Sequence, residues 1–192
     1  MKLLIPILVG YLIGSIPFSY LVVKLFGHQD IRKVGSGNVG TTNVARSLGI
    51  PYAVLAYVLD MSKGLLAFFI IRHFYDYGLG VLASAFAVIG HCYSVWLSFK
   101  GGKGIAVSSG FLLASSPVVA LILIGIQLIM VLLFRRMSLA SIISALCFPV
   151  VTYLINGVTP LLYVSFFMAP FVVFQHRENI KRLIQGKEKK LF

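Results

Sequence analysis

Long apolar segments alternate with short polar ones along the chain. A helix that crosses a bilayer needs about 20 mostly apolar residues. The pattern predicts seven helical segments: Leu3–Phe26, Gly49–Ile71, Leu79–Phe99, Ile105–Ser115, Pro117–Phe134, Leu139–Ile155 and Pro160–Phe174. The fourth is short, so we interpret it as a half-length or re-entrant helix, or as a span that begins inside the membrane. The sequence therefore predicts an all-α, polytopic integral membrane bundle of about seven transmembrane helices, with residues 1–192 as a single domain.

The composition agrees with a membrane protein and narrows the choice of partners. Of the 192 residues, 59% are hydrophobic and 11% are charged, whereas soluble domains average about 45–50% apolar and about 25% charged residues. The net charge of +12 favours anionic partners such as nucleic acid, anionic lipid or an anionic substrate. Nucleic acid is disfavoured because the apolar segments leave no soluble domain to bind it. Membrane lipids and an anionic substrate are the expected partners, and no obligate protein partner is evident.

The distribution of lysine and arginine predicts the orientation of the chain. With seven crossings, every Lys and Arg falls on one side of the membrane except Lys2 and Arg72, which fall on the other, and Lys63, which lies within a segment. Positively charged residues prefer the cytoplasmic side. The N-terminus is therefore predicted outside and the C-terminus in the cytoplasm.

The serine-glycine segment, Gly35–Arg46, is rich in small hydrogen-bonding residues. It matches G-x-G-x-x-G literally, but no strand precedes it, so a dinucleotide site is disfavoured. A P-loop needs Lys after the last glycine, where Thr41 stands. An ordinary polar loop is an alternative, although about fifteen residues is long for a structureless connection. In this segment the candidate catalytic residues are Ser36 and Asn38, and the candidate substrate-binding residues are Gly37, Gly40, Thr41, Asn43 and Arg46.

The lysine-glycine loop, Phe99–Gly104, stands between two apolar segments. Glycines let the backbone approach a ligand closely and can point N–H groups at an anion. A helix that begins just after Gly104 would add its N-terminal amides and its dipole. Two lysines would suffice for a positive-inside anchor, without the glycines. We therefore predict a phosphate-sized anion site at the membrane surface, formed by Lys100, Gly101, Gly102, Lys103 and Gly104, with His91 upstream.

A third polar cluster is the C-terminal basic segment, His176–Arg182. His176 and Asn179 are spaced i, i+3, so one helical face could carry both toward a site. The alternative is a basic amphipathic tail that lies on anionic lipid headgroups.

Three of the polar residues within the apolar segments are candidates for a specific role. Asp60 and Lys63 are spaced i, i+3 in the second segment. Charges at that depth are costly and are usually paired or functional, so we interpret them as a structural ion pair. Ser141 on the sixth segment is either a substrate contact or one of the small residues through which membrane helices pack.

Several kinds of catalytic site have no support in the sequence. There is no G-x-S-x-G and no H-E-x-x-H. The four histidines are scattered, and Cys92 and Cys147 both lie in apolar segments. No metal site and no other cofactor are therefore expected.

Three stretches in combination resemble one family: Ser36–Asn43, then Gly90-His91 with Phe99–Ala106, then His176–Arg182. Gly14–Phe18 and Asp60–Gly64 are also similar to blocks of that family. In this order, and over nearly its whole length, the chain resembles the bacterial membrane glycerol-3-phosphate acyltransferases that use acyl phosphate, the PlsY family. Thr41 stands where an alanine is common in the family.

The resemblance implies a seven-helix enzyme of the bacterial inner membrane with its active site toward the cytoplasm. It would transfer a fatty acyl group from acyl phosphate to the sn-1 hydroxyl of glycerol 3-phosphate, giving lysophosphatidic acid and phosphate in the first step of phospholipid synthesis. No CoA or acyl-carrier-protein thioester would be needed. A membrane transporter of a phosphorylated or other anionic solute is the alternative. Most polar residues are predicted at one surface, which favours an interfacial enzyme.

The residue roles follow from this resemblance as hypotheses. The acyl-phosphate group and the developing oxyanion would be held by Ser36, Asn38, Lys103 and the Gly101–Gly102 amides. The candidates for the glycerol-phosphate side are Arg46, Lys103, Ser141, His176 and Asn179. His91 could take the hydroxyl proton, with Asp60 as its orienter, or the leaving phosphate could accept it. The phosphate is slightly favoured, since the motifs are rich in donors and poor in bases.

Overall fold

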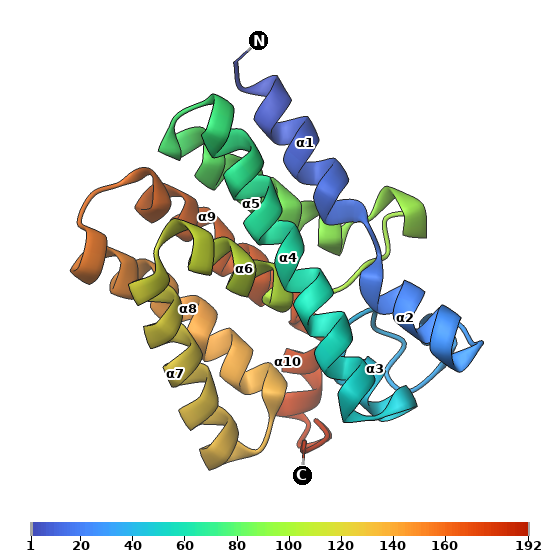
Figure 1. The fold of residues 1–192 in the computed structure, drawn as a ribbon. Helices are drawn as coiled ribbons and strands as arrows, with labels where there is room; N and C mark the ends of the chain where they lie inside the picture. Colours follow the sequence, from blue (N-terminus) through green and yellow to red (C-terminus); the bar gives the residue numbers. More distant parts are fainter. Residues whose placement is uncertain (1, 192) are drawn as a thin grey trace. The chain divides into compact units, whose positions relative to one another are not determined.

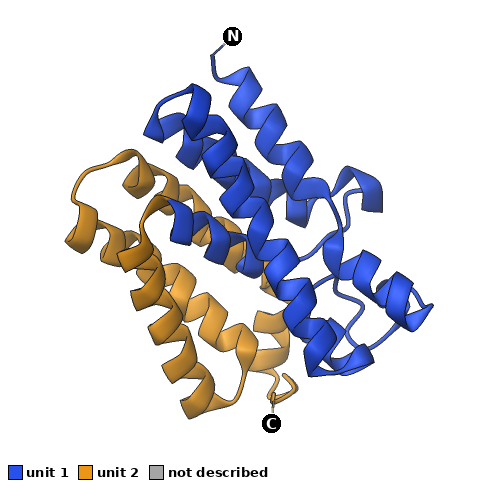
Figure 2. Ribbon diagram, in the orientation of Figure 1, with its two compact units in different colours: residues 1–114 blue, residues 115–192 orange. Residues whose placement is uncertain are grey.

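The computed structural model describes residues 2–191, which fold into helices and connecting loops (Figure 1). The chain forms two compact units, residues 1–114 and residues 115–192 (Figure 2). The elements up to the boundary are α1 (Leu4–Ser15), α2 (Phe18–Gly27), η1 (Ile31–Lys33), α3 (Thr41–Leu48), α4 (Ile50–Phe74), α5 (Tyr77–Cys92), η2 (Val95–Leu97) and α6 (Ile105–Ser115). Those beyond it are α7 (Pro117–Phe134), α8 (Met137–Asn156), α9 (Pro160–Gln175) and α10 (Arg177–Ile184). The single domain expected over residues 1–192 stays a prediction.

All seven predicted segments are helical, which confirms the all-helical class. Among the described residues, five stretches are long and apolar enough to cross a membrane: Leu4–Gly27, Ile50–Phe74, Tyr77–Leu97, Pro117–Phe134 and Met137–Asn156. The apolar helices Ile105–Ser115 and Pro160–Gln175 are shorter. The number of crossings stays a prediction.

Two of the predicted segments are interrupted. The first was expected to run from Leu3 to Phe26, but α1 ends at Ser15 and α2 begins at Phe18. Pro17 has no N–H and disfavours a helical conformation at Ile16, which breaks the helix there. The third was expected to reach Phe99, but α5 ends at Cys92 and the chain continues through η2.

Helix α1 packs directly on α5 through glycines. A Cβ at Gly10 would meet the backbone of Ala83, and a Cβ at Gly14 would meet the backbone of Ala87. Gly90 faces the carbonyl oxygen of Tyr11 in the same way. Such backbone contact is typical of helices packed in a membrane, where small residues allow close approach. It fixes the end of α5, which carries His91.

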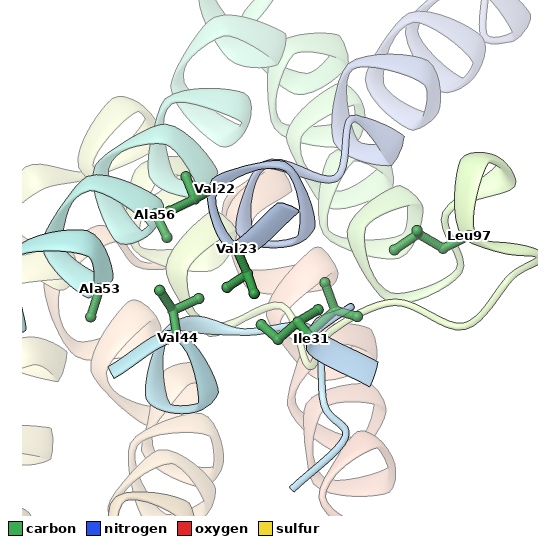
Figure 3. Packing of buried hydrophobic residues seen from close by; sticks show 8 residues of the cluster. Val22, Val23, Ile31, Val44, Ala53, Ala56 and Leu97 are labelled. Carbon is green, nitrogen blue, oxygen red and sulfur yellow. The ribbon is translucent and has the colours of Figure 1, made fainter. Parts of the chain in front are cut away.

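A cluster of buried aliphatic side chains joins the polar segments of the first unit (Figure 3). Its residues come from α2, η1, the serine-glycine segment, α3, α4 and η2: Val22, Val23, Ile31, Val39, Val44, Ala53, Ala56 and Leu97. Val39 lies within the serine-glycine segment, and Leu97 closes η2, just before the lysine-glycine loop. The cluster therefore anchors both segments to one apolar core.

The second unit is a helical hairpin extended by α9 and α10. Hydrogen bonds link its elements: the Ser144 hydroxyl donates to the Leu123 carbonyl at 3.1 Å, and the Ser116 hydroxyl to Asn156 Oδ1 at 3.1 Å. The C-terminal residues fold back, since the Leu191 N–H donates to the carbonyl of Arg135 at 2.7 Å. The charged tail predicted after residue 175 is therefore partly helical and packed.

Candidate functional site

Asn43 shapes the serine-glycine segment from within. Its side-chain oxygen accepts a hydrogen bond from the Ser36 N–H at 2.9 Å, and its Nδ2 donates to the carbonyls of Ile31 at 3.1 Å and Val34 at 3.0 Å. The residue is 1% exposed. These bonds use the amide within the fold, where Asn43 positions Ser36, and the contact between Asn43 and substrate stays a prediction.

The rest of the serine-glycine segment presents hydrogen-bond donors to solvent. Ser36 is exposed and Asn38 is half-buried. Gly40, which has no side chain, occupies the N-cap of α3, and Arg46 is exposed on the same helix. The N-cap residue therefore has no side chain to accept hydrogen bonds from the first N–H groups of α3, and those groups attract negative charge. This end of the segment therefore suits an anion.

The lysine-glycine loop folds against the end of α5. The Gly101 N–H donates to the Cys92 carbonyl at 3.0 Å, and the Gly102 N–H donates to the His91 carbonyl at 3.1 Å. The last carbonyls of a helix lack partners within it, and these two amides supply them. Both amides are therefore hydrogen-bonded to α5 in this structure, and anion binding by Gly101 and Gly102 stays a prediction.

The start of α6 agrees with the sequence prediction. Gly104 has a φ of 87°, in the left-handed region that favours glycine, and α6 begins directly after it at Ile105. The N-terminal amides of α6 follow Lys103, which is half-buried, and Lys100 is exposed. Positive charge and a helix N-terminus thus occur together at this end of the loop.

Gly102 is the point at which the two polar segments meet. A Cβ placed there would collide with the Val39 carbonyl oxygen of the serine-glycine segment and with Nε2 of His91. Only a residue without a side chain fits between them. The structure therefore brings the serine-glycine segment, the lysine-glycine loop and His91 together in the first unit.

Behind His91 lies a buried charged network. The Lys63 ammonium is 2.7 Å from Asp60 Oδ1 and 2.9 Å from His91 Nδ1, and each of the two charged side chains is 1% exposed. It also donates to the Ile16 carbonyl at 2.8 Å, at the break between α1 and α2. The Ser19 hydroxyl donates to Asp60 Oδ2 at 2.6 Å. The predicted ion pair is present, but it belongs to a larger network that the sequence did not reveal.

In the second unit, the predicted residues lie around the start of α10. His176 is buried and its Nδ1 lies 2.8 Å from the Val172 carbonyl. Asn179, three residues on, is also buried, and its Nδ2 donates to Glu188 Oε1 at 2.7 Å. Ser141 is buried on α8, where its hydroxyl accepts a hydrogen bond from Gln127 of α7 at 3.4 Å.

Glu188 was missed by the sequence interpretation. Its carboxylate accepts hydrogen bonds from Ser138 at 2.6 Å, from Asn179 and from Arg182 at 2.7 Å. Partial burial raises the pKa of Glu188, but these hydrogen bonds and the charge of Arg182 outweigh it, so that the pKa lies below its ordinary value. The one signal in the sequence was an acid set among three lysines, at positions 187–190. Glu188 ties the C-terminal residues to Asn179 and to the start of α8.

Comparison with known proteins gives consistent matches over nearly the whole chain. The family model described as "Glycerol-3-phosphate acyltransferase" matches residues 4–186. The glycerol-3-phosphate acyltransferase of Syntrophomonas wolfei is 46% identical over 181 residues, covering 94% of this chain and 93% of that protein. The protein of the same name from Staphylococcus aureus strain JH9 is 38% identical over 202 residues, covering 100% of this chain and 98% of the relative.

Two solved structures have the same fold. Both are crystal structures of PlsY (YgiH), described as an integral membrane glycerol 3-phosphate acyltransferase. The glycerol 3-phosphate form is 37% identical with a TM-score of 0.92, and covers 99% of this chain and 96% of the other. The lysophosphatidic acid form is 35% identical with a TM-score of 0.90, and covers 99% and 95%.

Proposed function

The chain belongs to the glycerol-3-phosphate acyltransferase family, and from this premise we propose that it transfers a fatty acyl group from acyl phosphate to the sn-1 hydroxyl of glycerol 3-phosphate. The hydroxyl oxygen attacks the acyl carbonyl carbon, and a new ester bond forms. The bond from that carbon to the phosphate oxygen breaks. The products are lysophosphatidic acid and inorganic phosphate.

The meeting of two polar segments at Gly102 is the observation in this chain that supports the function most directly. Acyl phosphate and glycerol 3-phosphate both carry a phosphate, so the reaction needs neighbouring anion sites. An acyl phosphate is a mixed anhydride with a good leaving group, so the enzyme gains most by positioning the substrates and stabilising charge. Exposed donors on Ser36 and Arg46, and the lysines beside α6, are suited to that task. An anion transporter would not require this arrangement.

We assign the acyl-phosphate side to the exposed and half-buried donors of the first unit. Ser36, Asn38 and Lys103 would hold the phosphate and the developing oxyanion. Because the Gly101 and Gly102 amides are already paired, side chains and the start of α6 supply this stabilisation in their place. The remaining residues would shape the backbone around the phosphate or add positive charge: Gly37, Gly40, Thr41, Lys100 and Gly104.

We assign the glycerol-phosphate side to Arg46, Lys103, Ser141, His176 and Asn179. A guanidinium binds phosphate through two parallel hydrogen bonds, and Arg46 is exposed for this purpose. The neutral side chains would orient the glycerol hydroxyls. The hydroxyl proton passes to a phosphate oxygen in this proposal, because the polar segments offer many donors and few bases.

The chain is a multi-pass membrane protein, as its apolar helices and its integral membrane relative indicate. We further propose that it lies in the bacterial inner membrane, with the N-terminus outside, the C-terminus in the cytoplasm and the site facing the cytoplasm. The support is the lysine and arginine distribution, which obeys the positive-inside rule only in this orientation. Membrane lipids would then surround the exposed apolar faces.

The reaction can be tested with purified protein in liposomes. Palmitoyl phosphate and glycerol 3-phosphate are supplied together or singly, and released phosphate and lysophosphatidic acid are measured. Release that requires glycerol 3-phosphate and is matched by lysophosphatidic acid supports the proposal. Activity with palmitoyl-CoA and none with palmitoyl phosphate would overturn it.

A further inference from the structure

The buried network around Lys63 has a matched number of donors and acceptors. An ammonium group has three N–H bonds and no lone pair. Three acceptors surround Lys63 Nζ: Asp60 Oδ1 at 2.7 Å, the Ile16 carbonyl at 2.8 Å and His91 Nδ1 at 2.9 Å. The Ile16 carbonyl, at the break between α1 and α2, and His91 Nδ1, on α5, are hydrogen-bonded to Nζ, and Asp60 Oδ1, on α4, is its ion-pair partner.

This match fixes the position of the proton on His91. If Nδ1 accepts from the Lys63 ammonium, it carries no proton, and the neutral ring is protonated on Nε2. The opposite tautomer would set two donors against each other across 2.9 Å. Asp60 does not compete for Nδ1, because Oδ1 is 3.5 Å away and Oδ2 accepts from Ser19 at 2.6 Å.

The other edge of the ring faces the junction of the two polar segments. Nε2 of His91 and the Val39 carbonyl oxygen both lie where a Cβ of Gly102 would be. The His91 carbonyl accepts from the Gly102 N–H at 3.1 Å. His91 therefore contacts the lysine-glycine loop with its backbone, and Nε2 of its ring faces Gly102.

We propose that Ser19, Asp60 and Lys63 lock His91 in the Nε2–H tautomer, and that this N–H faces Gly102, where the serine-glycine segment and the lysine-glycine loop meet. His91 is then a positioning residue whose Nε2 already carries a proton, and it is not the general base. The catalytic consequence rests on the proposed acyl transfer, whereas the tautomer does not depend on it.

The tautomer can be read directly by NMR. The full chain is labelled with ¹⁵N-histidine and placed in lipid nanodiscs, and long-range ¹H–¹⁵N correlations are recorded at pH 7. His91→Gln removes one set of signals and so assigns it. We expect an unprotonated Nδ1 and a protonated Nε2. A proton on Nδ1, alone or on both nitrogens, would overturn the lock, whether or not the protein shows acyltransferase activity.

A lysine variant tests the origin of the lock. Lys63→Met removes the three N–H donors and keeps a chain of similar length. The His91 signals should then change to a mixture of tautomers, while Ser62→Ala on the same helix should leave them unchanged. Signals that stay purely Nε2–H in a folded Lys63→Met protein would refute the role of Lys63. If that variant does not fold, the measurement on the unaltered protein decides.

Two variants of His91 distinguish a role of its Nε2–H group from base catalysis. Gln places an N–H near the position of Nε2 but is no base, whereas Leu offers neither. We expect kcat/KM to fall less than about tenfold in His91→Gln with an unaltered pH profile, and about 10²-fold in His91→Leu because the loops shift. Equal losses in both, of the roughly 10²–10⁴-fold size typical of a lost base, would overturn the proposal. The exposed His73→Gln is the matched control.

Discussion

Gly102 leaves no space for a side chain. A methyl group there would overlap the Val39 carbonyl and Nε2 of His91, and both are held by packed backbone or by a hydrogen-bonded ring. Neither neighbour can move without separating the two polar segments. We expect Gly102→Ala to lower kcat/KM by about 10²-fold, the size of effect that a small misplacement of reacting groups produces.

The matched control for that change is Gly125→Ala on α7. A Cβ at Gly125 meets nothing within 4 Å. Alanine also has the higher helix propensity, by about 1 kcal/mol. Phosphate release and thermal unfolding of both variants are compared with the unaltered protein. Equal activity of the two variants would contradict the crowding at Gly102.

Alanine substitutions of Asn43 and Asn38 should differ in their effects on stability and on activity. Asn43→Ala removes three hydrogen bonds of a buried amide and leaves backbone groups of the segment unpaired, which costs about 1–3 kcal/mol for each such group. We expect a clear fall in the unfolding temperature together with lost activity. Asn38→Ala, at a half-buried position, should lower activity at a nearly unaltered unfolding temperature. A stable and active Asn43→Ala protein would refute its positioning role.

These residues also show what a sequence can predict at this scale. The donor-rich segments were recognisable because glycine, serine, asparagine and lysine rarely cluster beside apolar spans. The partner of each donor was not recognisable. Asn43 bonds to carbonyls of Ile31 and Val34, and Gly101 bonds to the end of α5. Those acceptors become available only where η1 and α5 end, which depends on tertiary packing.

Helix α10 is the element whose stability should depend on pH. Its Asn179 and Arg182, with Ser138 of α8, hold the ionised Glu188 carboxylate. The folded-state pKa of Glu188 lies below its ordinary value, which is about 4.3 for an unfolded glutamate. The stabilisation is therefore present above that value and is lost as the pH falls through the lower folded pKa. The protection of α10 against hydrogen exchange, taken relative to the intrinsic rate at each pH, should fall over this acidic range.

A neutral variant tests the same contact at neutral pH. Glu188→Gln should loosen α10 at pH 7 to the extent that acid does in the unaltered protein, and should remove most of the acid dependence. The control is Glu178→Gln on the same helix, because Glu178 and its partner Lys181 are both exposed and such pairs contribute little. An acid dependence of α10 that persists unchanged in Glu188→Gln would show that another group causes it.

The boundaries of elements were harder to predict than their existence. The apolar pattern indicated every long helix, because a bilayer demands a long run of apolar residues whatever the neighbours are. It did not indicate α3 and α10, which are short, polar helices of eight residues each. Their helical form depends on contacts such as Val44 in the apolar cluster and Asn179 with Glu188. Pro17 was a visible break signal, and the structure shows that it divides the first span.

At the scale of the whole molecule, the charge distribution predicts the orientation of the chain in the membrane, which hydropathy cannot predict. Hydropathy predicts which segments enter the bilayer, and it is symmetric with respect to the two sides. Lysine and arginine break that symmetry, because basic loops are retained on the cytoplasmic side. The same pattern tests the number of crossings: if Ile105–Ser115 did not cross, the basic residues after it would change sides. Orientation and crossing number are thus one prediction.

Two exposed positions can test that prediction by cysteine labelling in cells. Val158 follows α8 and is predicted outside, whereas Lys33 closes η1 and is predicted in the cytoplasm. A membrane-impermeant maleimide should label Val158→Cys in intact spheroplasts and Lys33→Cys only after permeabilisation. The unaltered protein gives the background from Cys92 and Cys147, which are buried and half-buried. Labelling of both positions from the same side would mean that an odd number of crossings is missing between them, and labelling in the opposite order would invert the predicted path. Labelling of Lys33→Cys in intact spheroplasts would place the serine-glycine segment away from the cytoplasmic pool of glycerol 3-phosphate, because that segment directly follows η1.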